Sequence, residues 1–234
     1  DWLAGQHLAR PLRDFQVLHH GADIGASQPS TGLPPDAQQV LADIAGAPSF
    51  LMVGTVEPRK GHAQALDAFE QLWAQGEDVR LVIVGHEGWK GLPDGSRRTI
   101  PAIVKRLRSH PELGKRLHWL QGISDEYLDR VYAAGACLLF ASEGEGFGLP
   151  LIEAARHGVP LLARDLPVFR EVAGGHAHYF SGNDGAQLAG AIRDWLRLHA
   201  AGAHPAPQGI AARSWADNAA ELVRTLFPPM PSTP

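Results

Sequence analysis

The sequence has 234 residues, of which 44% are apolar and 20% are charged, and its 21 basic against 25 acidic side chains leave a formal net charge of −4. A chain of this length can bury enough apolar surface to fold without disulfides or a metal ion. The small negative charge gives no electrostatic reason to expect nucleic acid or an anionic membrane as the main partner.

The first 49 residues differ in composition from the rest of the chain. They contain one apolar run, at residues 15–18, followed by a stretch rich in glycine, proline and serine at 21–35. This composition predicts the end of a preceding domain and a connector over residues 1–49. The chain also begins with Asp1 rather than methionine, which indicates a piece of a longer protein.

From residue 50 onwards, short apolar runs alternate with amphipathic segments. Runs that are apolar throughout are typical of strands buried on both faces of a parallel sheet. The expected strands span residues 50–55, 79–85, 117–122, 136–142, 159–165 and 176–180. The expected helices span residues 62–75, 124–134, 150–157, 186–200 and 210–227. The alternation predicts an α/β domain over residues 50–227, with a doubly wound parallel sheet, followed by a frayed proline-rich tail at 228–234.

A basic pair follows the first expected strand. Gly54 and Thr55 lead to Arg59 and Lys60, which lie just before a helix. Two cations beside the free N–H groups of a helix start suit a diphosphate, because arginine can bind two oxygens while lysine acts as a point charge. A solvated basic pair in a turn remains the alternative interpretation.

A glycine-rich loop follows the fourth expected strand. Glycines at 144, 146 and 148 let the backbone approach a ligand, and Glu145 lies among them. Glu153 falls about one turn into the next helix, where side chains lean toward the helix N-terminus. The loop therefore suits a ligand with a phosphate and flanking hydroxyls, such as a nucleotide sugar. A glycine-rich turn with Glu153 as a surface residue favoured by the helix dipole explains it equally well.

A third strand end offers only backbone groups. Gly122 and Ile123 stand between the third expected strand and Ser124, a good helix N-cap. Accessible backbone groups there could contact a flat base edge, although a plain strand-to-helix turn accounts for the same residues.

Together these segments resemble the C-terminal half of the retaining glycosyltransferases of family 4, which have the two-domain GT-B fold. The resemblance covers about residues 15–227 and rests on four segments in order: residues 53–61, 120–135, 142–165 and 166–175. The third contains two glutamates separated by seven residues, Glu145 and Glu153, as the family's most characteristic block does. The implied fold is Rossmann-like.

The resemblance implies a role for each matched residue. Arg59 and Lys60 would hold the donor diphosphate and stabilise it as the leaving group, Glu145 would contact the hydroxyls of the transferred sugar, and Glu153 would contact those of the ribose. The Gly122 and Ile123 backbone would face the base. The remaining donor-binding positions are Gly54, Thr55, Gly146, Phe147, Gly148 and Leu149.

Two departures from the family pattern are visible. Many relatives have arginine where Thr55 stands, so the grip on phosphate would rest more on Arg59 and Lys60. His62 stands where relatives with the Glu-Pro-Arg-Lys form often have asparagine, and the resemblance assigns no role to this histidine. The resemblance also implies no cofactor and no metal, because the basic side chains and the helix N-terminus would stabilise the diphosphate in place of a metal ion. The twelve histidines lack a metal-binding spacing as well.

The resemblance implies a hexosyltransferase of polysaccharide biosynthesis. The chain would be its donor-binding domain, in an enzyme that moves a sugar from GDP-mannose or a UDP-sugar to a glycan or lipid-linked acceptor. The N-terminal acceptor domain would be missing, so the chain alone should bind donor but transfer little. A nucleotide-sugar epimerase and a non-catalytic nucleotide-sugar-binding module remain alternatives. A dehydrogenase is disfavoured by the absence of G-x-G-x-x-G after the first strand, and a P-loop enzyme by Gly61 after Lys60.

The sequence also bears on location. Cys137 is the only cysteine and so cannot form an internal disulfide, which favours a reducing cytoplasm. No apolar run approaches the ~20 residues that a membrane-spanning helix needs, and the start lacks the regions of a signal peptide. We expect a cytoplasmic protein, with attachment to the inner membrane face through the missing domain left open.

Overall fold

In the computed structural model, residues 18, 20–22, 32–211 and 213–227 are described. The chain divides into two compact units, one of residues 24–212 and one that joins residues 1–23 with 213–234. The larger unit holds the sheet. The predicted tail at 228–234 and most of the apolar run at 15–18 lie outside the described residues.

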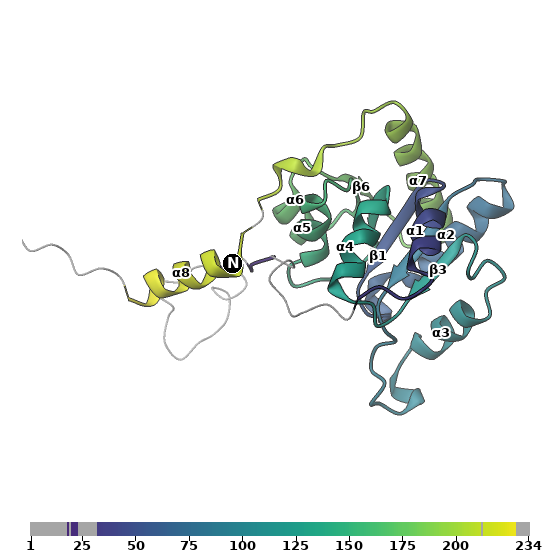
Figure 1. The fold of residues 1–234 in the computed structure, drawn as a ribbon, viewed down its shortest axis with the longest axis horizontal. Helices are drawn as coiled ribbons and strands as arrows, with labels where there is room; N and C mark the ends of the chain where they lie inside the picture. The colour runs from purple at the N-terminus through teal and green to yellow at the C-terminus, as the bar shows by residue number, and fades with distance from the viewer. Residues whose placement is uncertain (1–17, 19, 23–31, 212, 228–234) are drawn as a thin grey trace, which may run out of the picture. The chain divides into compact units, whose positions relative to one another are not determined.

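The larger unit is built around one six-stranded sheet (Figure 1). Its strands are β1 (Ser49–Val53), β2 (Arg80–Val84), β3 (Leu117–Leu120), β4 (Cys137–Phe140), β5 (Leu161–Arg164) and β6 (His178–Phe180). The order across the sheet is β3-β2-β1-β4-β5-β6, and every pair is parallel. The predicted doubly wound α/β sheet is confirmed. Strands β2 to β6 lie within the apolar runs identified in the sequence, and β1 begins at Ser49, one residue before its run.

Both faces of the sheet are covered by helices (Figure 1). The helices of this unit are α1 (Ala37–Ala45), α2 (His62–Ala74), α3 (Ile100–Arg108), α4 (Asp125–Ala134), α5 (Leu149–Arg156), α6 (Pro167–Ala173) and α7 (Gly185–Ala200). Helices α2, α3 and α7 share one apolar core with the strands. At its centre the ring of Phe50 packs against Phe69 and Trp195, with centroids 5.6 and 5.1 Å apart. Burial on both sides explains why β4 and β5 carry no exposed residue.

Three helices were not expected from the sequence. Helix α1 lies within the segment assigned to a connector and packs against α4. Helix α3 has its buried residues at three- and four-residue spacing (Ile100, Ile103, Val104 and Leu107), which is a helical pattern that the sequence already contained. Helix α6 begins at Pro167 and is only seven residues long.

The smaller unit contains helix α8 (Trp215–Leu226). The sequence predicted a helix from residue 210, but the described helix begins at Trp215. Ser214 caps it, because its hydroxyl accepts a hydrogen bond from the Asp217 N–H at 3.0 Å while Asp217 bonds back to the Ser214 N–H. This capping box marks where the helix starts.

The sheet has a topological switch point between β1 and β4. From β1 the chain moves outward through β2 to β3, and it then returns to β4 on the other side of β1. In open α/β sheets of this kind, ligands bind beyond the carboxyl ends of the strands at that point. The basic pair follows β1 and the glycine-rich loop follows β4, so both of these sequence features lie at the switch point.

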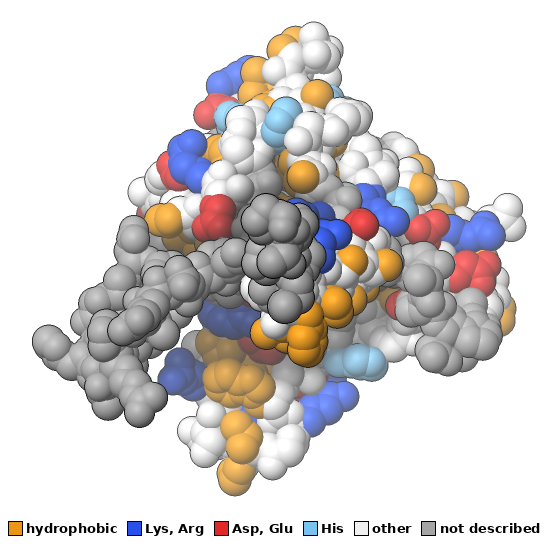
Figure 2. Space-filling view, turned by 90° about the vertical axis from the view of Figure 1, so that its left-hand side faces the viewer, with side chains coloured by type: hydrophobic (Ala, Val, Ile, Leu, Met, Phe, Trp, Pro, Cys, Tyr) orange, Lys and Arg blue, Asp and Glu red, His pale blue; other side chains and the backbone are white. Residues whose placement is uncertain are grey.

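The described surface shows neither a membrane span nor a dominant charge. None of the described helices is long and apolar enough to cross a membrane. Figure 2 shows side chains of both charges interspersed over the described part of the face that it draws. The distribution agrees with the small net charge of the sequence.

Candidate functional site at the switch point of the sheet

Two loops form the site and contact each other through their backbones. The first runs from β1 through a 3-10 turn (Pro58–Lys60) into α2. The Glu143 N–H in the second loop donates to the Arg59 carbonyl at 2.7 Å. Gly61 permits this approach: its φ is +76°, and a Cβ there would lie 2.4 Å from the Ala141 carbonyl oxygen. A side chain at this position would separate the loops.

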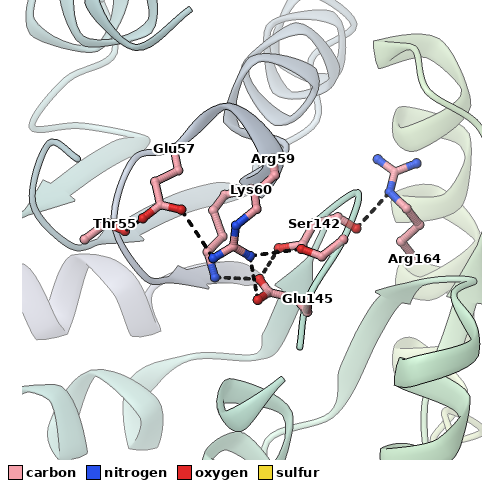
Figure 3. Close-up of polar contacts among 8 residues, drawn as sticks. Thr55, Glu57, Arg59, Lys60, Ser142, Glu145 and Arg164 are labelled. Atoms are coloured by element: carbon pink, nitrogen blue, oxygen red, sulfur yellow. Dashed lines mark hydrogen bonds and ion pairs between the residues drawn. The ribbon is translucent and has the colours of Figure 1, made fainter. Parts of the chain in front are cut away.

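Glu145 receives both cations of the basic pair (Figure 3). Its carboxylate contacts Arg59 Nη1 at 2.6 Å and Lys60 Nζ at 2.5 Å, and accepts a hydrogen bond from the Ser142 hydroxyl at 3.0 Å. The Glu145 side chain is 9% exposed and that of Lys60 13%, whereas that of Arg59 is 47% exposed. Burial alone would raise the pKa of Glu145, but the hydrogen bonds from Lys60 and Arg59 lower the pKa below its usual value. Glu145 is therefore an ionised counter-ion for two cations.

Further polar groups orient the exposed Arg59. Its guanidinium donates to the Gly144 carbonyl at 2.9 Å and contacts the Glu57 carboxylate at 3.3 Å. The Thr55 hydroxyl donates to the same carboxylate at 2.6 Å. Glu57 was part of the basic motif in the sequence but was assigned no role. Gly54 lies beneath the pair, since a Cβ there would be 3.5 Å from Lys60 Nζ.

The glycine-rich loop ends at the N-terminus of α5. Gly148 occupies the N-cap position with φ +97°, a conformation that disfavours other residues, and Leu149 and Pro150 open the helix. The first N–H groups of a helix have no partner within it and attract anions. The structure leaves open space around Gly146, where a Cβ would meet no atom within 4 Å. The glycine-rich loop therefore leaves space in front of the N-terminus of α5.

Glu153 lies on α5 but is directed toward helix α4. Its carboxylate accepts a hydrogen bond from the Tyr132 hydroxyl at 3.0 Å. Among the described residues it has no recorded contact with Arg59 or Lys60. Burial raises the pKa of Glu153, and the hydrogen bond from Tyr132 opposes this shift in part. The structure thus brings Glu145, but not Glu153, into direct contact with the cations.

The third predicted strand end has a neighbour that the sequence did not reveal. Gly122 follows β3 with φ +63°, and a Cβ there would lie 3.2 Å from the ring of His86, which follows β2. Ile123 is partly exposed in the same turn. His86 therefore lies beside the backbone groups proposed to face a base. Its only sequence signal is its place just after a strand.

Arg164 supports the glycine-rich loop from behind. This residue ends β5, is buried, and donates to the Ser142 carbonyl at 3.2 Å and to the Asn183 side chain at 2.9 Å. It also hydrogen-bonds to Gln64 on α2. No sequence motif assigns a role to Arg164, although a single charged residue at the end of an apolar strand already indicates a buried polar contact.

Neither a metal-ion cluster nor a reactive cysteine is found among the described residues. No group of three or more histidine, cysteine, aspartate or glutamate side chains is arranged there to hold a metal ion. Cys137 is buried in β4, and burial raises the pKa of its thiol well above the usual value. A thiol in that state is a poor nucleophile.

Comparison with known sequences gives one consistent family. A sequence model described as "Glycosyl transferases group 1" matches residues 36–215. The serotype-specific mannosyltransferase WbdA of Escherichia coli is 49% identical over 228 residues, which cover 96% of this chain and 27% of that protein. The phosphatidyl-myo-inositol mannosyltransferase of Mycobacterium leprae is 29% identical over 79% of this chain and 47% of its own length. This chain thus spans about a quarter of the WbdA relatives that it matches.

Solved structures agree with the fold. The sucrose-phosphate synthase of Thermosynechococcus elongatus superposes with a TM-score of 0.65 at 26% identity, covering 91% of this chain and 52% of that chain. The HepE protein of Anabaena, solved in complex with UDP and glucose, superposes with a TM-score of 0.66 at 18% identity over 91% of this chain and 56% of its own. The second likeness bears on the fold alone.

Proposed function

The chain belongs to the group 1 glycosyl transferases, and on that premise we propose that it is the donor-binding half of a retaining hexosyltransferase that uses a nucleotide-diphosphate sugar. The observation that carries the proposal is the convergence of Arg59 and Lys60 on Glu145 at the switch point of the sheet. The curated relatives include mannosyltransferases, so GDP-mannose is the first donor to test and UDP-sugars are the second.

Each part of the donor has a matching group at the site. The diphosphate would take the two cations and the N-terminus of α5, where charge-assisted hydrogen bonds and the helix dipole act together. Glu145 would contact the hydroxyls of the sugar. The second carboxylate, Glu153, would accept from the ribose through Oε1, because Tyr132 already occupies Oε2. The base would lie against the Gly122 and Ile123 backbone.

The proposed chemistry needs charge stabilisation more than proton transfer. As the bond between the sugar and the diphosphate breaks, negative charge grows on the leaving group, and Lys60 and Arg59 would stabilise that charge. The acceptor hydroxyl would attack from the face that the leaving group vacates, which retains the configuration. No resident metal or other cofactor is proposed. The acceptor, a glycan or a lipid-linked saccharide, would bind to a domain outside this chain.

Calorimetric titration of the chain with GDP-mannose, UDP-glucose and GDP tests the proposal. We expect binding of at least one nucleotide sugar, and weaker or no binding after Lys60→Ala. Lys105→Ala, which removes an exposed lysine from α3, is the matched control and should bind as the wild type does. A chain that binds none of these nucleotides would contradict the proposal.

Two alternatives are distinguished by different measurements, the epimerase by its products and the non-catalytic module by the transfer rate. An epimerase would convert one nucleotide sugar into another without an acceptor, which NMR of the incubated donor would reveal. A non-catalytic module would bind donor, yet an enzyme containing this chain would keep its rate after Lys60→Ala. The contact of both cations with Glu145 is expected of the transferase and of the module, since both would bind the donor diphosphate, so the transfer rate after Lys60→Ala decides between them.

A further inference from the structure

His62 is a buried histidine directly behind the basic pair. It is the first residue of α2, two positions after Lys60, and only 2% of its surface is exposed. Its ring atom Nδ1 is buried and has no hydrogen-bond partner among the protein atoms that the structure describes. A buried polar atom without a partner costs free energy and needs an explanation.

The ring also contacts the turn that carries the cations. The Glu57 backbone lies within hydrogen-bond reach of the ring and opposes the lowering of the His62 pKa. Because Nδ1 has no partner among the described protein atoms, we assign this contact to Nε2. The same Glu57 carbonyl accepts the Lys60 N–H at 3.1 Å. With its proton on Nε2, the neutral ring presents a lone pair at Nδ1.

A small cavity is lined in part by His62. It has a volume of about 10 Å³ and its polar lining comes from Lys60, His62 and Ser142. This volume is close to the minimum that holds one water molecule, which also needs two to four polar partners. The Lys60 ammonium has three N–H donors, of which the contact with Glu145 uses one.

The imidazole is kept neutral by its surroundings. Burial lowers the pKa of His62 to about 4, and the nearby charge of Lys60 acts in the same direction. At neutral pH the ring can therefore accept a hydrogen bond next to an ammonium group. A protonated ring would lose that lone pair and repel Lys60.

We propose that His62 is a positioning residue for Lys60, acting through one buried water molecule in this cavity. The water donates to His62 Nδ1 and to the Ser142 hydroxyl oxygen, and it accepts from the Lys60 ammonium. The ring thereby fixes the turn through Glu57 and the ammonium through the water. The consequence for catalysis rests on the proposed donor-binding function, whereas the water site itself does not.

Three substitutions separate the two contacts of the ring. His62→Asn keeps a polar amide near the position of Nδ1, and His62→Gln keeps one near Nε2. His62→Leu keeps neither. We expect donor affinity within about threefold of wild type for His62→Asn, a loss of about tenfold for His62→Gln, and a larger loss for His62→Leu.

His118→Gln is the matched control for burial. His118 is also buried, and its ring bonds to the Lys115 carbonyl at 3.1 Å at the start of β3, away from the carboxyl ends of the strands. Its replacement should lower stability without changing donor affinity. If His62→Gln binds donor as tightly as wild type, or if His118→Gln weakens binding equally, the positioning role is overturned.

A structural measurement decides the water site independently of donor binding. A high-resolution crystal structure of the wild-type chain should show a water molecule within hydrogen-bond distance of both His62 Nδ1 and Lys60 Nζ. Nitrogen NMR should show the neutral Nε2–H tautomer from pH 6 to 8. An empty cavity or the other tautomer would overturn the inference. If the wild type binds no nucleotide sugar while the water is present, the proposed function fails and the water site stands.

Discussion

Lys60 and Arg59 share Glu145 as a counter-ion, but their surroundings differ. The Lys60 side chain is largely buried beside Glu145, whereas half of Arg59 faces solvent. Water screens an exposed charge strongly and a buried one much less. At the residue scale, the buried lysine should therefore stabilise developing charge more than the exposed arginine does.

Replacing Lys60 tests this difference. In an enzyme that joins this chain to its acceptor domain, Lys60→Ala should lower the transfer rate about 100-fold, or about 3 kcal/mol, because a fixed cation is lost from the leaving group. Arg59→Ala should lower the rate by a smaller factor. Steady-state kinetics with the proposed donor measure both, and Lys105→Ala serves as the unaffected control. Equal rates for Lys60→Ala and wild type would place the leaving group elsewhere.

The contact between Tyr132 and Glu153 leads to a second prediction, which concerns the pH dependence of donor affinity. Burial raises the pKa of Glu153, and the Tyr132 hydroxyl opposes this rise. If the ionised carboxylate binds the ribose, donor affinity increases as pH rises and Glu153 loses its proton. Tyr132→Phe removes the opposing hydrogen bond, so the pKa rises further and the increase in affinity moves to higher pH.

Titration calorimetry of the chain from pH 5 to 8 measures the shift. Glu153→Gln is the control, since it has no proton to lose and should show no transition. A transition at the same pH in wild type and Tyr132→Phe would show that Glu153 does not govern donor binding.

At the scale of elements, the site depends on two loops that meet over the ends of β1 and β4. The Arg59 carbonyl and the Glu143 N–H join them, and Gly61 leaves the room that this contact needs. Arg164 anchors the second loop to the end of β5. The charges of the first loop therefore reach Glu145 of the second only while the loops stay in contact.

Gly61 and Gly76 offer a matched pair of substitutions. Both glycines have positive φ, +76° and +85°, but a Cβ at Gly61 would collide with Ala141 while one at Gly76 would meet nothing within 4 Å. Gly76→Ala should cost about 1 kcal/mol of stability from backbone strain alone and leave donor affinity unchanged. Gly61→Ala should cost more and weaken donor binding by separating the loops. Chemical denaturation and calorimetry measure the two effects, and equal donor affinity in both variants would contradict the role of the loop contact.

At the scale of the molecule, the switch point brings together the polar side chains of two loops. Loops from β1 and β4 present the cations and carboxylates on one edge of the sheet. In the proposed enzyme, the acceptor would approach from a separate domain across this edge.

If the donor and the acceptor bind to different domains, the isolated chain should bind the donor without transferring its sugar efficiently. The isolated chain should bind donor about as tightly as the longer enzyme, yet transfer sugar at least about 100-fold more slowly, because no second domain orients the acceptor. A transfer assay on both proteins, with calorimetry on the same samples, measures this. Full activity in the chain alone would show that it also holds the acceptor.

The sequence by itself determined the strands, most of the helices and the family. Apolar runs and helical spacing report local burial, and both periodicities can be read without coordinates. The sequence also identified Arg59, Lys60, Glu145 and Glu153 as candidates, because they follow expected strands or open the next helix and match the motifs of the family. The pattern in residues 100–107 shows that α3 could have been predicted as well.

Only the tertiary structure decided which side chains meet. Seven residues separate Glu145 from Glu153, but that spacing does not tell which carboxylate faces the cations. The answer depends on the contact between the two loops and on Tyr132 from α4. His62, His86 and Arg164 gained their neighbours in the same way, from elements far apart in the chain. Such contacts follow from the strand order, which long-range packing sets and no local pattern encodes.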